Sequence, residues 1–265
     1  LDDLGIDLAI NPRRECADEI VHMLQIPGTR EVVNMLGGRV LTVGFHLPDN
    51  SPMAGTRLGN CPEPARLERV RLIARMREEH FAIPHGETDF LPDDELYITG
   101  TPRDAADFVS WASPGIEPVE RVVIAGGGGL GLTIAARLEK VGRKVVVIEQ
   151  NHEQAQVCSA LLSKGLVLQG DTMSRDTLTE AGFTKATAFV AATGDDENNI
   201  ISCLLAKQCG APFTIAQVSH PEYVPVINGL HLLNRAVSTH LSLINSILHF
   251  TRGQHVKAAS LLHRL

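Results

Sequence analysis

The sequence lacks two features that would each define a class of protein. No apolar run approaches the roughly 20 residues that a membrane-spanning helix needs, so we expect no transmembrane helix. There is also no excess of basic residues, because the formal net charge is −7. Non-specific nucleic-acid binding requires a basic surface, so this charge argues against a nucleic-acid partner.

The cysteines show no C-x-x-C pair, and their number is odd. The five thiols are spread along the chain: Cys16, Cys61, Cys158, Cys203 and Cys209. This pattern is typical of reduced, mostly buried thiols in a cytosolic protein. The eleven histidines are equally scattered, with no H-x-x-x-H pattern and no pairing with a carboxylate along the sequence. We therefore expect neither a metal site nor a histidine that transfers protons.

A glycine-rich segment between two apolar runs is the most informative feature. Val122–Gly131 reads V-V-I-A-G-G-G-G-L-G, and Lys144–Glu149 reads K-V-V-V-I-E. This order predicts a buried strand, a glycine turn, an amphipathic helix and a second buried strand that ends in an acid. Gly126 permits the tight turn, Gly128 lets the backbone approach a pyrophosphate, and Gly131 lets helix and strand pack closely. The amides at the helix start would face the phosphates.

The acid at the end of the second strand indicates which nucleotide would bind. Glu149 follows Gly131 by eighteen residues, where a carboxylate can accept hydrogen bonds from an adenosine ribose. A 2′-phosphate would be repelled there, which favours NAD over NADP. A glycine turn in a Rossmann-like domain that binds nothing is the alternative. The predicted contacts of the glycine loop are Gly126, Gly127, Gly128, Gly129, Leu130 and Gly131.

Two further strand ends carry polar residues. Gly170 and Asp171 follow the third predicted strand, and Asp171 either contacts the adenine side of a ligand or caps the next turn. Thr193, Asp195 and Glu197 follow the fourth strand. Asp195 is well placed as the N-cap of the next helix, and Thr193 and Glu197 are candidates for the nucleotide pocket.

The chain from residue 118 to 252 alternates strictly between strands and helices, which predicts a doubly wound parallel α/β sheet. The expected strands lie near 121–125, 144–149, 166–168, 187–192, 213–218 and 234–237. The expected helices lie near 130–141, 152–163, 174–181, 196–208, 221–229 and 239–249. Residues 30–113 instead show short strands near 40–45, 70–74 and 95–99 between turn clusters, which predicts a small α+β module.

An internal repeat relates the two ends of the chain. Ile6, Ala9, Ile20 and His22 recur 227 positions later as Leu233, Ala236, Ile247 and His249. The repeat suggests that residues 1–28 end a first Rossmann-like domain and that 253–265 begin a second small module. We therefore expect the sequence to be a fragment of a longer protein.

The combined motifs resemble the RCK (KTN) domains of Trk-type potassium uptake systems. The resemblance rests on Gly126–Gly131, Glu149, Gly170–Asp171, Glu180–Phe183, Thr193–Asn198 and Leu204–Gly210. It implies a Rossmann-like RCK-N domain paired with an RCK-C module, and contacts from the loop glycines to the pyrophosphate, from Glu149 to the ribose and from Asp171 to the adenine side. It also implies NAD(H), or ATP or ADP, as the ligand.

The same resemblance implies a role and a set of partners. The expected protein is a cytoplasmic regulatory subunit, peripheral on the inner face of the plasma membrane. It would form a homo-oligomeric ring of RCK domains beneath a membrane-embedded potassium transporter subunit of the TrkH/TrkG kind, and would gate transport without catalysis. The rival hypothesis is an NAD-dependent dehydrogenase, and a third is the tail of a cation/proton antiporter.

Overall fold

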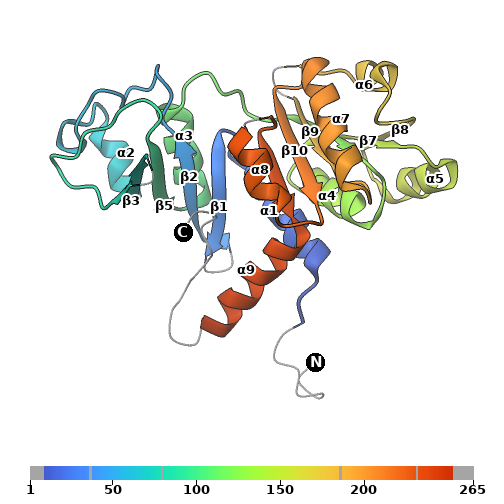
Figure 1. The fold of residues 1–265 in the computed structure, drawn as a ribbon, viewed down its shortest axis with the longest axis horizontal. Coiled ribbons are helices and arrows are strands. Elements are labelled where there is room, and N and C mark those ends of the chain that lie inside the picture. Colours follow the sequence, from blue (N-terminus) through green and yellow to red (C-terminus); the bar gives the residue numbers. More distant parts are fainter. Residues whose placement is uncertain (1–8, 36–37, 79, 185–186, 231, 253–265) are drawn as a thin grey trace. The chain divides into compact units, whose positions relative to one another are not determined.

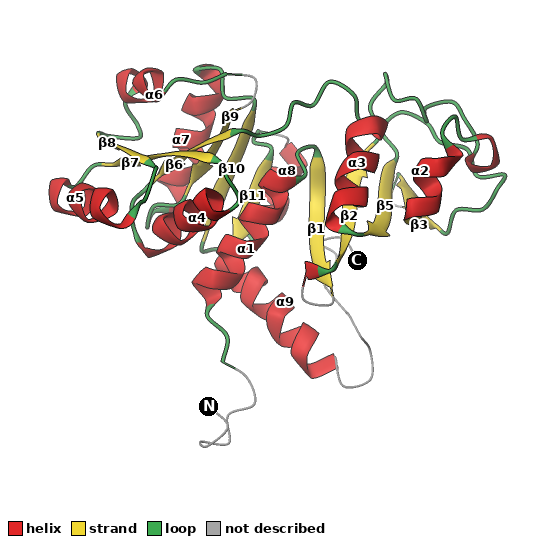
Figure 2. Cartoon of the chain, turned by 180° about the vertical axis from the view of Figure 1, so that it is seen from behind, coloured by secondary structure: helices red, strands yellow, loops and turns green. Residues whose placement is uncertain are grey.

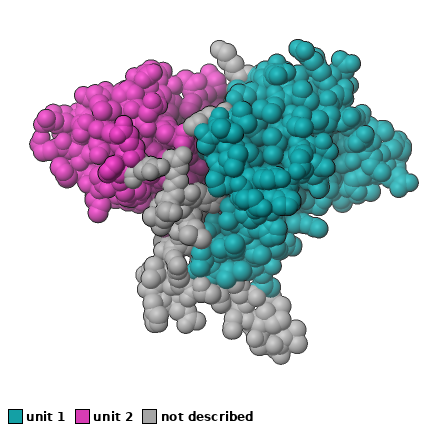
Figure 3. Space-filling view, in the orientation of Figure 1, with its two compact units in different colours: residues 1–21, 119–251, 263–265 teal, residues 22–118, 252–262 magenta. Residues whose placement is uncertain are grey.

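A computed structural model describes residues 9–35, 38–78, 80–184, 187–230 and 232–252 (Figure 1). Within them, residues 9–21 and 119–251 form one compact unit, the Rossmann-like unit, and residues 22–118 form a second, the small unit (Figure 3). Residues 1–8 of the expected first Rossmann-like domain and the expected second small module over 253–265 fall outside the described residues. None of the described helices is long and apolar enough to cross a membrane.

The Rossmann-like unit is built on a six-stranded sheet in which every neighbouring pair of strands is parallel. The strand order is β11-β10-β9-β6-β7-β8. The strands are β6 (Arg121–Ala125), β7 (Lys144–Glu149), β8 (Leu166–Gln169), β9 (Thr187–Ala191), β10 (Phe213–Val218) and β11 (Arg235–Ser238). The order reverses direction beside β6, so the predicted doubly wound sheet is confirmed, with its switch point between β6 and β9.

Helices connect these strands in the predicted alternation (Figure 2). They are α4 (Gly129–Lys140), α5 (His152–Leu161), α6 (Arg175–Ala181), α7 (Asp196–Gln208), α8 (Tyr223–Leu230) and α9 (Thr239–Arg252). The side chains of Asn151, Ser174 and Asp195 cap α5, α6 and α7 by accepting a backbone N–H of the first turn. The prediction that Asp195 is an N-cap is therefore confirmed.

The core of this unit lies on both faces of the sheet, which explains the near-continuous apolar strands. Val123 and Ala125 of β6 belong to a fully buried cluster with residues of α6, α7 and α8. Ile124 points to the opposite face, where it lies close to Gly131 of α4. Alternate residues of one strand thus hold helices on the two sides of the sheet.

Helix α1 (Pro12–Gln25) packs its first turns onto the Rossmann-like unit. Cys16, Ala17 and Ile20 are buried. Arg137 of α4 pairs with Asp18 and donates a hydrogen bond to the carbonyl of Arg14. These contacts place α1 beside the helix that follows the glycine turn.

The small unit contains a five-stranded antiparallel sheet with the order β1-β2-β5-β3-β4. Its elements are β1 (Thr29–Met35), β2 (Val40–His46), a 3-10 turn (Leu58–Asn60), α2 (Pro64–Arg69), β3 (Val70–Arg77), β4 (His80–Ala82), β5 (Glu95–Gly100) and α3 (Pro102–Ala112). Phe108 of α3 packs edge-on against Phe45 of β2, with ring centroids 6.2 Å apart. The sequence patterns did not predict α2 or β4, both of which are short.

Candidate functional site

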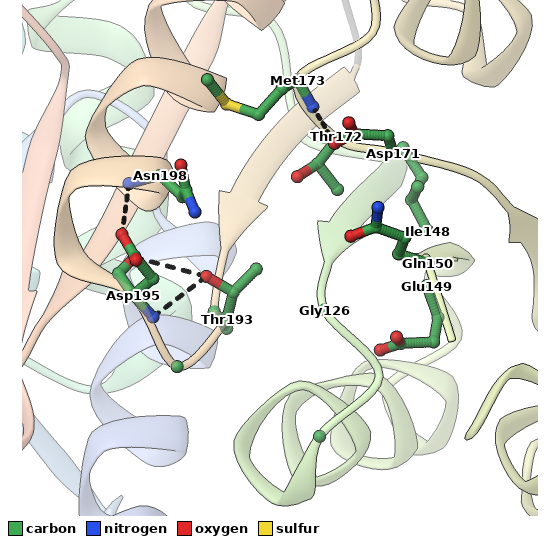
Figure 4. Close-up of a pocket in the computed structure, with 13 residues that line it drawn as sticks. Gly126, Ile148, Glu149, Gln150, Asp171, Thr172, Met173, Thr193, Asp195 and Asn198 are labelled. Carbon is green, nitrogen blue, oxygen red and sulfur yellow. Dashed lines mark hydrogen bonds between the residues drawn. The ribbon is translucent and has the colours of Figure 1, made fainter. Parts of the chain in front are cut away.

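A pocket lies at the carboxyl edge of the parallel sheet, where the order of the strands reverses (Figure 4). Its volume is about 390 Å³, which is within the usual range for small-molecule sites. In Figure 4, Thr193, Asp195 and Asn198 lie on one side of the pocket. Glu149 and Asp171 lie on the other side. Polar groups from three strand ends therefore face one another across the cavity.

The glycine turn at the base of the pocket depends on two residues that no larger side chain can replace. Gly126 has a φ of +100°, and a Cβ there would lie 2.9 Å from the carbonyl oxygen of Ala192. A Cβ on Gly131 would lie only 2.0 Å from the carbonyl oxygen of Gly126. These contacts agree with the predicted roles of Gly126 in the tight turn and of Gly131 in close packing of helix on strand.

The start of α4 is left open by the protein. Its N-cap is Gly128, which offers no side chain to the first amides of the helix, whereas α5, α6 and α7 all have side-chain caps. A Cβ on Gly128 would meet nothing within 4 Å. An uncapped helix N-terminus with clear space in front of it is suited to a phosphate group.

An arginine that the sequence analysis did not single out also lies at this helix start. Arg13 of α1 places Nη1 2.9 Å from the position that a Cβ on Gly129 would occupy. It comes from a distant part of the sequence, so only the fold brings it here. A guanidinium beside helix amides strengthens the local preference for an anion.

Glu149 holds the backbone of the glycine loop as well as lining the pocket. Its Oε2 accepts a hydrogen bond from the Gly127 amide at 2.7 Å, and its Oε1 accepts one from Asn151 at 2.8 Å. The Gly127 carbonyl in turn accepts a hydrogen bond from Gln154 at 2.6 Å and lies 3.3 Å from the thiol of Cys158. Both backbone polar groups of Gly127, the amide and the carbonyl, are therefore held by side chains. The sequence predicted the position of Glu149 but not these supports.

The other predicted strand-end residues are also anchored locally. Asp171 lines the pocket, and its Oδ1 accepts a hydrogen bond from the amide of Met173 at 2.8 Å. The turn-capping alternative is therefore confirmed, and contact with a ligand stays a prediction. The hydroxyl of Thr193 donates to Oδ1 of the buried Asn199 at 2.7 Å. Asn199 in turn donates to the carbonyl of Gln217 at 2.9 Å. This amide links the ends of β9 and β10.

Six of the twelve predicted site residues line the pocket: Gly126, Gly128, Glu149, Asp171, Thr193 and Asp195. Gly127, Gly129, Leu130, Gly131 and Gly170 are outside that lining but lie in the glycine loop or next to Asp171. Glu197 is not among the lining residues, and its carboxylate accepts a hydrogen bond from Tyr223 at 3.3 Å. The lining residues that the sequence analysis missed are Ile148, Gln150, Thr172, Met173, Ala192, Gly194 and Asn198.

A carboxylate–histidine pair, which the sequence patterns did not reveal, connects the start of α7 to the residues that follow β10. Asp196 is buried and accepts hydrogen bonds from the backbone amides of Ser219 and His220 and from the His220 ring, at 2.7 Å. Burial opposes ionisation of Asp196, but these hydrogen bonds lower its pKa. The Asp196 carboxylate raises the pKa of His220. The two residues are far apart in sequence, so spacing could not predict the pair.

Replacement of Asp196 by Asn should return the pKa of His220 toward its ordinary value of 6.5. The stabilisation from the pair is lost as pH falls through the lowered pKa of Asp196. It is also lost as pH rises through the raised pKa of His220. An NMR titration of the His220 ring checks this prediction. Glu222→Gln is the matched control and should shift the pKa less, and an unchanged His220 pKa in Asp196→Asn would contradict the assignment.

No group of three or more His, Cys, Asp or Glu side chains positioned to hold a metal ion occurs among the described residues.

A doubly wound parallel sheet, a glycine turn at its switch point and an acid at the end of the next strand define the class of Rossmann-like nucleotide-binding domains. Comparison with protein families is more specific. Residues 122–239 match the TrkA-N domain, and residues 43–113 match the TrkA-C domain. The chain therefore carries a TrkA-C domain followed by a TrkA-N domain.

Curated relatives match almost the whole chain. It is 29% identical to the Trk system potassium uptake protein TrkA of Azorhizobium caulinodans, over 98% of this chain and 57% of that protein. It is 32% identical to the protein of the same name from Halomonas elongata, over 97% of this chain and 56% of that protein. The chain thus spans a little more than half the length of these relatives.

Solved structures share the fold. The GsuK channel aligns with a TM-score of 0.63 and 20% identity, over 96% of this chain and 45% of that one. A structure of the GsuK channel bound to NAD aligns with a TM-score of 0.60 and 21% identity, over 95% of this chain and 45% of that one.

Proposed function

We propose that this chain binds NAD(H), or alternatively ATP or ADP, in the pocket at the carboxyl edge of the sheet, and that binding regulates a potassium uptake system. The observation that carries the proposal is the uncapped start of α4 beside a carboxylate-lined pocket. The names of the relatives support the link to potassium uptake, and the NAD-bound GsuK channel supports the choice of ligand.

The diphosphate would lie over the start of α4. Gly128, Gly129 and Leu130 offer amides that no capping side chain of the protein occupies, and the space before Gly128 is clear. The N-terminal end of the helix dipole favours the negative charge. Arg13, beside Gly129, would add a cation from α1. The phosphates would thereby connect the glycine loop to a helix from outside the core of the TrkA-N domain.

The adenosine would extend along the side of the pocket that carries the acids. Glu149 keeps lone pairs free beyond its two backbone hydrogen bonds, because each carboxylate oxygen accepts two. It would accept hydroxyl hydrogens of the ribose and repel a 2′-phosphate. Asp171 would lie on the adenine side, with Thr193 and Asp195 across the pocket.

Regulation requires that the ligand binds two conformations of the assembly with different affinity. The proposed partner is a membrane-embedded Trk-type potassium transporter, and the proposed assembly is a ring of TrkA-type domains on the cytoplasmic face of the membrane. No catalytic base is needed for this role. The dehydrogenase alternative has no specific observation in its favour, since the relatives are named as potassium uptake proteins.

Potassium flux with and without nucleotide tests the proposal. The chain is added to proteoliposomes that contain the transporter, and flux is recorded with and without NADH. We expect NADH to change the flux in the presence of wild-type protein but not of Gly128→Ala, whose added methyl group would occupy the phosphate space. A potassium flux that is the same with and without NADH would contradict the regulatory role. Steady reduction of NAD in the presence of alcohols or hydroxy acids would instead establish an enzyme.

A further inference from the structure

Helices α1 and α9 are counterparts in the internal repeat of the sequence. α1 runs over Pro12–Gln25 and α9 over Thr239–Arg252, so their first residues and their last residues are each separated by the repeat interval of 227 positions. Residues 12–21 of α1 and 239–251 of α9 belong to the Rossmann-like unit. Figure 1 shows them crossing close to each other at the base of that unit.

Two acid–hydroxyl contacts join these helices. Ser242 lies 2.5 Å from Glu19, and Ser246 lies 2.6 Å from Glu15, measured from Oγ to Oε2. By the repeat, Glu15 is the counterpart of Ser242, and Glu19 is the counterpart of Ser246. Exchange of the two helices therefore converts one contact into the other. This reciprocity is the signature of a two-fold interface, here between unlike helices.

The chemistry of the pairs differs from that of an ordinary surface contact. Ser242 is buried and also lies within hydrogen-bond distance, 3.0 Å, of the carbonyl of Ser238. Burial raises the pKa of Glu19, and the hydrogen bond from Ser242 opposes this shift. A carboxyl group that loses water at this contact needs a hydrogen-bond partner, and the serine hydroxyl provides one. A second carboxylate in place of the serine would instead repel the first when both are ionised.

We propose that the two Glu–Ser contacts select the partner of α1: a helix of the unlike repeat that carries hydroxyl groups four residues apart, and not a second copy of α1. In the same two-fold arrangement, two α1 helices would bring Glu15 of each against Glu19 of the other. Two α9 helices would bring together only serines. The acids and the hydroxyls are therefore segregated so that the mixed pair is favoured.

Variants that exchange acids and serines between the two helices test this selection. Ser242→Glu with Ser246→Glu gives α9 the contact residues of α1, so that four acids meet. Adding Glu15→Ser and Glu19→Ser to that variant exchanges the acids and hydroxyls between the helices and restores both contacts. Because Arg137 independently holds α1 through Asp18 and the Arg14 carbonyl, loss of the pairs should loosen α1 without removing every contact.

Alkylation of Cys16 reports whether α1 stays docked. Cys16 is fully buried and contacts Thr239 and Ser242 of α9. Cys158 and Cys203 are also fully buried in the same unit and serve as internal controls for its fold. Peptide-resolved mass spectrometry after timed exposure to iodoacetamide measures all three thiols in one sample.

We expect Cys16 to react at least about tenfold faster in the Ser242→Glu, Ser246→Glu variant than in wild type, which corresponds to about 1.4 kcal/mol. The variant with all four substitutions should return to the wild-type rate. If the two-site variant also exposes Cys158 and Cys203, the four-site variant still decides, because restored protection of Cys16 supports the proposal. A four-site variant in which Cys16 stays reactive, or a two-site variant in which Cys16 is as protected as in wild type, would overturn it.

Discussion

Gly131→Ala is expected to lower the free energy of unfolding by about 3 kcal/mol or more. The new Cβ would lie 2.0 Å from the carbonyl oxygen of Gly126, a backbone atom that cannot rotate away. Relief requires α4 to move off β6, which would open the core around Ile124. Urea denaturation followed by circular dichroism measures the loss.

Gly128→Ala is the matched control for this prediction, because it adds the same methyl group to the same loop. A Cβ at Gly128 meets nothing within 4 Å, and the backbone there is extended with φ −69°. We expect the free energy of unfolding to stay within about 0.5 kcal/mol of wild type. NADH affinity should nevertheless fall at least about tenfold, because the methyl group takes space that the diphosphate needs. Equal stability losses in the two variants would contradict the proposed division of roles.

Glu149→Arg is expected to lower NADH affinity on the order of 100-fold. The change removes the proposed charged acceptor of the ribose hydroxyls, and hydrogen bonds to charged groups contribute roughly 1.5–3 kcal/mol each. It also removes the hydrogen bonds that position Gly127 and Asn151. The preference against NADPH should disappear, because an arginine accepts a 2′-phosphate. Calorimetric titration with NADH and NADPH gives both affinities.

Glu153→Arg is the matched control for charge. Glu153 lies in the first turn of α5 and is exposed, and it does not line the pocket. The Glu153→Arg substitution changes the net charge by the same amount as Glu149→Arg, a few residues away in sequence. The NADH affinity of this variant should therefore stay within about twofold of wild type. Unchanged NADH binding in Glu149→Arg would show that the carboxylate does not hold the ribose.

The fold was largely predictable because the Rossmann-like unit follows strong local rules. Its strands are continuous apolar runs, and three of its helices follow the N-cap residues Asn151, Ser174 and Asp195, which are of the residue types that favour this position. The small unit was less predictable. β4 has three residues and α2 has six, which is too short for hydrophobic periodicity to register.

The candidate site was only half predictable, and the reason is distance along the chain. Gly126, Gly131 and Glu149 follow from a local motif whose spacing reflects turn and packing geometry. Arg13 and the His220–Asp196 pair depend on segments that only the folded sheet brings together. Glu197 is the reverse case: its place in the sequence suggested the pocket, but it is not among the lining residues, and its carboxylate accepts a hydrogen bond from Tyr223.

An NMR titration of the ¹⁵N-labelled protein with NADH tests the central claim most directly, since it reports on individual backbone amides. The account predicts saturable binding with the largest shifts at the amides of Gly128, Gly129 and Leu130, and smaller shifts around Glu149 and Asp171. Spectra that do not change with millimolar NADH, NAD, ATP or ADP, or shifts confined to residues away from the start of α4, would contradict it.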